Sequence, residues 1–241
     1  MAKFKLAFEE NFDYNGKPNP EIWTFQVGPK WANNEKQCYV DKLENCYVSD
    51  GALHIIATKS DDPNCPYESA RIMSKDKKHF QYGRFVVRAK MPKGRGAWPA
   101  IWFMGTVKGQ GWPACGEIDL MEFAGNRRTQ VTSAYHTKTY NHSINTHKEG
   151  VLIANNLDTE FHDYILEWTK DHISFQVDYE EILRAEKKPN DTFAEWPFDQ
   201  PYYMIINLAV GGWYGGNIVD EDFPFHFEVA SIRHFEIIEE K

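Results

Sequence analysis

Short apolar runs recur along the chain and are separated by glycine, proline, asparagine and aspartate. Runs of this kind, rich in β-branched and aromatic residues, are typical of β-strands, and no long window shows the spacing of an amphipathic helix. Residues 169–172 lie between two such runs and predict a β-hairpin. The clearest predicted strands cover residues 53–57, 85–91, 164–168, 173–177 and 203–208.

Many short strands with frequent turns and almost no helix predict an all-β fold. We expect a β-jelly-roll sandwich of two curved antiparallel sheets, in which the concave face of one sheet forms a cleft. No internal repeat, low-complexity segment or linker-like stretch divides the 241 residues. Residues 1–241 are therefore predicted to form a single domain.

The most informative segment contains three acidic residues, Glu117, Asp119 and Glu122. Glu117 and Asp119 alternate with apolar residues, so on a strand both carboxylates share one face. Strict alternation would turn Glu122 into the core, where an unpaired carboxylate is very costly. A β-bulge at residues 120–121 would remove this conflict, because two residues would then occupy one position of the strand. We therefore predict a bulge and three carboxylates on one face.

Three carboxylates on one face repel one another, so the pKa of at least one of them should be raised. Carboxyl groups held in different environments are what acid–base catalysis uses, and two such groups facing one cleft suit the hydrolysis of glycosidic bonds. The alternatives are a solvated acidic face or a calcium site. Calcium sites usually recruit backbone carbonyls from loops, which a strand with apolar alternation does not offer.

Three of the eight tryptophans, Trp98, Trp102 and Trp112, lie in one segment that is also rich in glycine and proline. Flat apolar rings next to polar groups suit the apolar faces of pyranose sugars. Aromatic residues also dominate the packing of protein cores, so a core cluster is the other interpretation of each ring.

The charge balance argues against some classes of partner. With 27 basic and 35 acidic side chains the net charge is −8, whereas binding to nucleic acid is driven by lysine and arginine. No apolar run approaches the ~18 residues that a membrane helix requires. We expect a monomer with neither nucleic acid nor a membrane as its partner.

The cysteines and the N-terminus bear on the compartment. Cys38, Cys46, Cys65 and Cys115 show no CxxC pair and no metal-ligand spacing with histidine. We expect free thiols rather than a Cys38–Cys46 disulfide, because nothing in the sequence proves an oxidising compartment. The first residues show no signal-peptide pattern. We expect a secreted or periplasmic protein whose signal peptide is absent from this sequence, with a cytoplasmic protein as the alternative.

Residues 112–123, which contain the three acids, resemble the signature of glycoside hydrolase family 16. The spacing E-x-D-x-x-E is similar to that of the bacterial laminarinase branch, whereas the lichenase branch has the shorter E-x-D-x-E. The resemblance extends over nearly the whole chain. Further matching blocks are residues 82–85, 94–104, 161–164 and 207–212.

The resemblance implies a β-jelly roll with a sugar-binding cleft and retaining, endo-acting hydrolysis. The expected substrates are polysaccharides with internal β-1,3 bonds, such as laminarin, together with mixed-linkage β-1,3-1,4-glucans such as lichenan. By the same resemblance Glu117 matches the nucleophile and Glu122 the general acid/base. Asp119 matches the residue that assists them by hydrogen bonding and charge.

The resemblance also implies residues that bind the sugar. Trp98, Trp102 and Trp112 would stack on sugar rings, and Trp213 would lie at the rim of the cleft. Three of the polar candidates also have an interpretation without a role in sugar binding. Arg88 would then lie on the surface of a strand, His136 would be a buried structural histidine, and Asn207 would cap a turn. The candidates for contacts with sugar hydroxyls are Asn34, Arg88, His136 and Asn207.

No cofactor or metal is expected to be needed for catalysis. A structural calcium is doubtful, because Ala230 stands where many relatives carry an aspartate. One alternative function is non-catalytic recognition of β-glucan, which is disfavoured because all three acids are present. Another is a family 16 hydrolase acting on agarose or carrageenan; sulfated substrates would favour a basic cleft, and the net charge argues against one.

Overall fold

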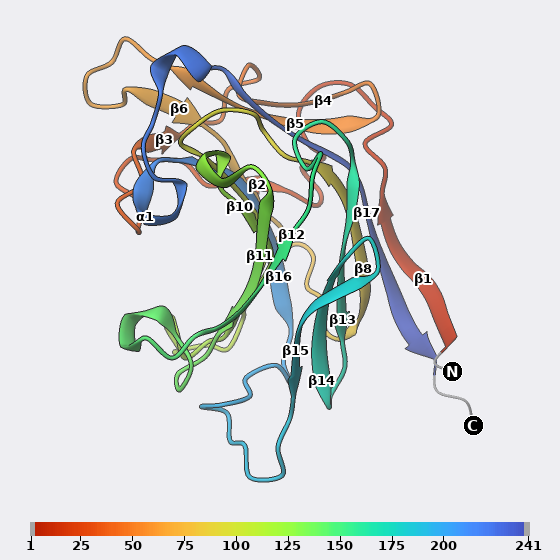
Figure 1. Ribbon diagram of the computed structural model, residues 1–241. Helices are drawn as coiled ribbons and strands as arrows, with labels where there is room; N and C mark the ends of the chain where they lie inside the picture. The colour runs from red at the N-terminus through yellow and green to blue at the C-terminus, as the bar shows by residue number, and fades with distance from the viewer. Residues whose placement is uncertain (1–2, 239–241) are drawn as a thin grey trace.

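Figure 1 shows the computed structural model of the protein, which describes residues 3–238. Strands dominate it and form two stacked sheets. The strands of the larger sheet are β1 (Lys3–Glu10), β3 (Gln37–Tyr39), β4 (Cys46–Ser49), β5 (Ala52–Lys59), β6 (Tyr67–Ser69), β8 (Gly83–Lys90), β13 (His162–Trp168), β14 (His172–Val177), β15 (Glu180–Glu186) and β17 (Phe225–Ile238). The strands of the smaller sheet are β2 (Thr24–Phe25), β7 (Arg71–Met73), β9 (Ala97–Gly105), β10 (Glu117–Phe123), β11 (Gln130–His136), β12 (Lys148–Ile153) and β16 (Tyr202–Val210).

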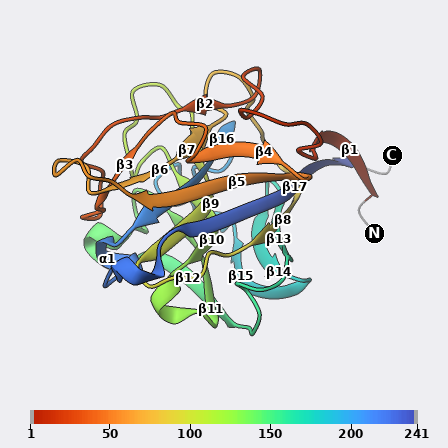
Figure 2. The same ribbon diagram turned by 90° about the horizontal axis from the view of Figure 1, so that it is seen from above.

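The larger sheet has ten strands in the order β15-β14-β13-β8-β17-β5-β6-β3, with β1 pairing with β17 and β4 with β5. Figure 2 shows β4, β5 and β17 running side by side as one layer. The smaller sheet has seven strands in the order β12-β11-β10-β9-β16-β7-β2. Strand pairs are antiparallel except β3 with β6. The predicted all-β sandwich is confirmed, and so is the hairpin, formed by β13 and β14.

In the part of the chain that the structure describes, helical structure is confined to four single turns. They are the 3-10 turns η1 (Gly125–Arg127), η2 (His142–Ile144) and η3 (Asp220–Asp222) and the α-helical turn α1 (Gly212–Gly215). Within residues 3–238, no helix has the length and apolar character that crossing a membrane requires.

The core lies between the two sheets. Successive side chains of a strand point to opposite faces, so each strand directs every second side chain into the core. In β8, Phe85, Val87 and Ala89 are fully buried, and the alternate residues Met204 and Ile206 of β16 in the other sheet belong to the same core cluster. Burying each large apolar side chain contributes about 1.5–3 kcal/mol. Polar residues on the opposite face of the smaller sheet are therefore left to form its concave surface.

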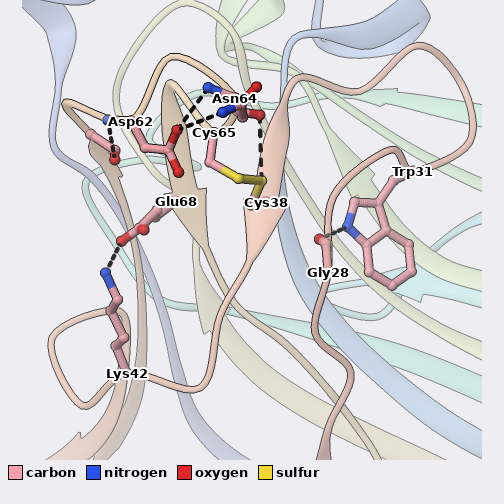
Figure 3. The surroundings of a disulfide bond; sticks show 9 residues. Gly28, Trp31, Cys38, Lys42, Asp62, Asn64, Cys65 and Glu68 are labelled. Atoms are coloured by element: carbon pink, nitrogen blue, oxygen red, sulfur yellow. Dashed lines mark hydrogen bonds and ion pairs between the residues drawn. A yellow bond between two sulfur atoms is a disulfide. The ribbon is translucent and has the colours of Figure 1, made fainter.

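The prediction of free thiols is wrong for two of the four cysteines. Cys38 in β3 and Cys65 in the loop before β6 form a disulfide, with their Cα atoms 5.5 Å apart (Figure 3). Cys46 and Cys115 are free and buried. The pairing depends on the contact between β3 and β6, which are neighbours in the sheet although 27 residues separate the two cysteines in the sequence. Cysteine spacing alone could not reveal it.

Candidate active site

A β-bulge in β10 sets the direction of the acidic side chains. Along β9 the neighbouring residues Trp102 and Ile101 pair with Asp119 and Met121, so β10 carries one residue more than its partner. Its other neighbour, β11, shows a register shift over the same interval. Leu120 and Met121 are consequently both buried in the core. The predicted bulge at residues 120–121 is confirmed.

A side chain of the adjacent strand stabilises the bulge. The Ser133 hydroxyl donates a hydrogen bond of 2.7 Å to the Leu120 carbonyl. Ser133 is buried, and an unpaired backbone carbonyl in the core would be costly. The bond therefore gives the irregular backbone a partner.

The bulge brings the three acids into one cavity. Glu117, Asp119 and Glu122 all line a cavity of about 500 Å³ on the concave face of the seven-stranded sheet. A pocket of this size, with aromatic walls and a few convergent polar groups, is typical of a ligand site. Its lining residues are Trp31, Ala32, Asn33, Glu35, Arg71, Trp98, Ala100, Trp102, Met104, Trp112, Glu117, Asp119, Glu122, His142, Asn207, Ala209 and Trp213.

Burial raises the pKa of every member of this trio. The pKa of Asp119 rises to about 8 through burial, and that of Glu122 rises to about 8 through burial and the nearby Asp119. Burial and Asp119 also raise the pKa of Glu117 well above its usual value, while His136 and Trp112 oppose the rise. The trio therefore shares protons and does not carry three negative charges at neutral pH. The prediction of at least one raised pKa is confirmed.

Two neighbouring side chains fix the acids. The Trp98 indole donates a hydrogen bond of 3.0 Å from Nε1 to Oε1 of Glu122. The Nε2 atom of His136 lies 3.3 Å from Oδ2 of Asp119 and 3.7 Å from Oε1 of Glu117. His136 is buried and does not line the cavity, so it touches the acids rather than the cavity itself.

The aromatic candidates are brought together as the sequence suggested. Trp98, Trp102, Trp112 and Trp213 line the cavity, and Trp213, carried by α1, is 73% exposed at its edge. The Trp102 indole donates a hydrogen bond of 2.8 Å to Oδ1 of Asn207. Asn207 therefore lies inside β16 with its side chain on the cavity wall, not at a turn.

Three of the four predicted sugar contacts do not line the cavity. His136 lies buried behind the acids, as its alternative interpretation had it, and the other two are placed elsewhere. Asn34 is exposed and its Oδ1 accepts a hydrogen bond from Lys36, while its neighbours Asn33 and Glu35 line the cavity. Asn33 and Asn34 both have a positive φ, so no strand alternation indicates which side chain points inward.

Arg88 belongs to β8 of the other sheet, is 44% exposed, and pairs with Asp163 at 3.1 Å. Its predicted role in the cavity is wrong. The alternative interpretation, a residue on the surface of a strand, is confirmed.

Sequence reasoning missed several wall residues. The Arg71 guanidinium lies over the rings of Trp31 and Trp102, at 5.1 and 4.8 Å from their centroids. Burial raises the pKa of Glu35, and the charge of Arg71 opposes that rise. His142, in η2, stacks near Trp112 with ring centroids 4.7 Å apart. The missed residues Trp31, Glu35, Arg71 and His142 come from three separate segments, and no local pattern in the sequence joins those segments.

One group of side chains could hold a metal ion. Glu117, Asp119 and His136 each offer a ligand atom, and these atoms lie within 4.8 Å of one another. The same three residues belong to the acidic centre of the cavity, so a bound metal would compete with acid–base chemistry there.

Comparison with known proteins agrees with this geometry. The family model described as glycosyl hydrolases family 16 matches residues 32–226. A protein named beta-glucanase from Rhodothermus marinus is 38% identical, over 98% of this chain and 86% of its own length.

Two solved structures share both the fold and much of the sequence. The laminarinase from Rhodothermus marinus superposes with a TM-score of 0.95 at 37% identity, covering 99% of this chain and all of that one. A non-specific endo-β-1,3(4)-glucanase of family GH16, solved with 1,3-β-D-cellobiosyl-glucose at its active site, has a TM-score of 0.93 at 36% identity, covering 97% of this chain and 95% of that one. With most of the chain matched both in sequence and in three dimensions, the protein belongs to glycosyl hydrolase family 16.

Proposed function

We propose that the protein is a retaining endo-β-1,3-glucanase in which Glu117 is the nucleophile and Glu122 the general acid/base. The bulge in β10 carries this proposal, because it turns both glutamates into one cavity while giving them different neighbours. Family membership and the glucanase relatives support the reaction class. The recognition of β-glucan without hydrolysis is not favoured, since the chain keeps every acid that the reaction needs.

The proton on Glu122 begins the reaction. A general acid must be protonated before it acts, and a pKa of about 8 keeps Glu122 protonated at neutral pH. Its Oε1 accepts the hydrogen bond from Trp98, so Oε2 is the oxygen free to carry the proton. Glu122 donates this proton to the glycosidic oxygen as the carbon–oxygen bond breaks.

The ionised carboxylate of Glu117 attacks the anomeric carbon in the same step and forms a glycosyl-enzyme. Burial and Asp119 raise the pKa of Glu117, and His136 and Trp112 favour its ionised form by opposing that rise. Glu122, now a carboxylate, then takes a proton from water, and the resulting hydroxide equivalent releases the sugar from Glu117. Two displacements at one carbon return the β configuration.

Asp119 supports both glutamates from the same face of β10. With a pKa of about 8 it is neutral at neutral pH and can donate a hydrogen bond. If it ionises, its charge contributes to the raised pKa of Glu122. Its position therefore favours a protonated Glu122 in either state.

The walls of the cavity suit a neutral polysaccharide. Trp31, Trp98, Trp102, Trp112 and Trp213 supply flat apolar surfaces for sugar rings. Arg71 is the only arginine or lysine among the lining residues, and its charge is balanced by Glu35. A sulfated galactan would bring further negative charge next to three carboxyl groups. Carrageenan is disfavoured for this reason. Agarose is uncharged, and β-1,3-glucan and mixed-linkage glucan are favoured over it because several similar proteins are named as glucanases and laminarinases.

A polysaccharide panel tests this function. Laminarin and lichenan should be cut to oligosaccharides of intermediate size, as internal cleavage requires, while agar and carrageenan should stay intact. Proton NMR during the first minutes should show the β anomer of the new reducing end. An initial α anomer would mean inversion and would remove Glu117 from its role.

The reaction needs no metal in this proposal, because the two glutamates supply nucleophile, acid and base. Activity should therefore persist in a chelator.

We also propose that the protein is a monomer and that it works in an oxidising compartment, outside the cell or in the periplasm. The Cys38–Cys65 disulfide supports the oxidising compartment. Size-exclusion chromatography tests whether the protein is a monomer. A thiol count on protein from its native source, before and after reduction, tests whether the disulfide forms in its compartment.

A further inference from the structure

His136 approaches two of the three acids through one ring nitrogen. Its Nε2 lies 3.3 Å from Oδ2 of Asp119 and 3.7 Å from Oε1 of Glu117. All three residues present a ligand atom within 4.8 Å of the others. One nitrogen and two carboxylate oxygens therefore lie close together, with the two acids on the cavity wall and His136 behind them.

The buried oxygen in this group lacks a partner. Asp119 is only 5% exposed, and its Oδ2 accepts no hydrogen bond from the residues that the structure describes. An unsatisfied buried polar atom costs about 1–3 kcal/mol. The catalytic steps proposed above do not require this oxygen to remain unpaired. A ligand that bound Oδ2 would offset the cost.

The distances from the His136 nitrogen to the two carboxylate oxygens suit a tetrahedral Zn²⁺ ion. A tetrahedral Zn²⁺ site has Zn–N and Zn–O bonds of about 2.0–2.2 Å, which puts neighbouring ligand atoms ~3.4 Å apart. The separations of His136 Nε2 from the two carboxylate oxygens, 3.3 and 3.7 Å, bracket this value, and all three ligand atoms lie within 4.8 Å of one another. Ca²⁺ needs about six to eight oxygen ligands and Mg²⁺ prefers octahedral oxygen, so neither fits a nitrogen and two oxygens.

The histidine is held in place behind the two acids that line the cavity. The ring of His136 stacks on that of His147 at 5.7 Å between centroids, and Trp112 and His142 pack nearby at 6.0 and 5.1 Å. Glu117 and Asp119 line the open cavity, so a fourth position on the ion would face it. A ligand set fixed in advance loses little conformational freedom on binding.

We propose that Glu117, Asp119 and His136 form a Zn²⁺ site whose occupation inhibits the enzyme. Inhibition rests on the proposed function, because an ion bound to the Glu117 carboxylate takes the electron pair that would attack the anomeric carbon. Binding itself does not rest on it. Free Zn²⁺ and glucan would thus exclude each other from the cavity.

Calorimetric titration of Zn²⁺ into the chelator-treated protein at pH 7 measures the site directly. We expect one equivalent bound, with a tetrahedral visible absorption when Co²⁺ replaces Zn²⁺. His136→Ala should weaken binding by at least about 100-fold, beyond the 10–100-fold typical of losing an outer-shell partner. Asp119→Asn should also weaken it and covers the case in which His136→Ala does not fold. Ca²⁺ should not bind.

His162→Ala is the matched control. His162 also lies beside a carboxylate, with Nδ1 2.6 Å from Oδ2 of Asp178, but that pair is on the larger sheet. The metal-ligand grouping found among the described residues does not include it. The control should bind Zn²⁺ as the wild type does. Equal loss in His162→Ala and His136→Ala, or unchanged binding in both His136→Ala and Asp119→Asn, would overturn the proposed site.

Activity separates this inference from the proposed function. Zn²⁺ should stop laminarin hydrolysis, and a chelator should restore it. If the wild type binds one Zn²⁺ at His136 but cuts no glucan, the proposed function fails and the metal site stands. If it cuts glucan but binds no Zn²⁺ by calorimetry, or keeps full activity with the site occupied, this inference fails and the function stands.

Discussion

The hydrogen bond from Trp98 to Glu122 gives a direct test of the acid/base assignment. Trp98→Phe keeps an aromatic ring in the cavity wall but removes the Nε1 donor that lies 3.0 Å from Oε1 of Glu122. This donor lowers the pKa of Glu122, opposing the effect of burial. Without it the ionised carboxylate loses a partner, so the pKa of Glu122 should rise above about 8.

The size of the shift follows from the strength of the bond. A hydrogen bond to a charged group contributes about 1.5–3 kcal/mol, and one pKa unit corresponds to about 1.36 kcal/mol. The pKa of Glu122 should therefore rise by about 1–2 units. Because a general acid works only while protonated, the alkaline limb of kcat/KM should move to higher pH by the same amount.

The pH profile of kcat/KM on laminarin measures this shift. Trp102→Phe is the control, because its Nε1 donates to Asn207 and not to an acid. It also removes an indole from the cavity wall, so it should raise KM while leaving the alkaline limb in place. An unmoved limb in Trp98→Phe, or equal shifts in both variants, would refute the assignment of Glu122 as the acid that controls this limb.

Three further predictions test the nucleophile, the bulge and the disulfide. Glu117→Gln should lower kcat by roughly 1,000-fold or more while laminarin binding in affinity electrophoresis persists; near-normal turnover would contradict its role. Deleting Met121 should restore regular alternation and turn Glu122 into the core, so both activity and the melting temperature should fall; a fully active protein with an unchanged melting temperature would exclude the bulge as the cause. Cys38→Ser opens a cross-link between cysteines 27 residues apart and should lower the free energy of unfolding in urea by about 3–4 kcal/mol; a loss below about 1 kcal/mol would mean that the bond constrains the unfolded chain little.

Local sequence patterns predicted the main features of this protein. Short runs of β-branched and aromatic residues identified strands such as 85–91 and 203–208, because such side chains pack well on a pleated sheet. Strand alternation, applied to the three acids, required a bulge to avoid burying Glu122 in the core. The acidic face, the bulge and the fold class are consequences of local sequence and were predictable for that reason.

Which residues reach the cavity could not be predicted from local sequence in the same way. A predicted strand contains Arg88, but the sequence did not show that this strand lies in the sheet opposite the cavity. Asn33 rather than Asn34 lines the cavity, because both residues adopt a positive φ in a loop where no period applies. Arg71 reaches Trp31 and Trp102 only when three segments distant in the sequence come together.

The sequence by itself determined which residues are strand formers and which acids must share a face, since these follow from neighbours a few residues apart. Only the tertiary structure decided that Cys38 meets Cys65, that His136 stands against Glu117 and Asp119, and that burial raises the pKa of all three acids. Contacts between distant segments and the exclusion of water depend on how the two sheets pack, and no local pattern in the chain encodes that packing.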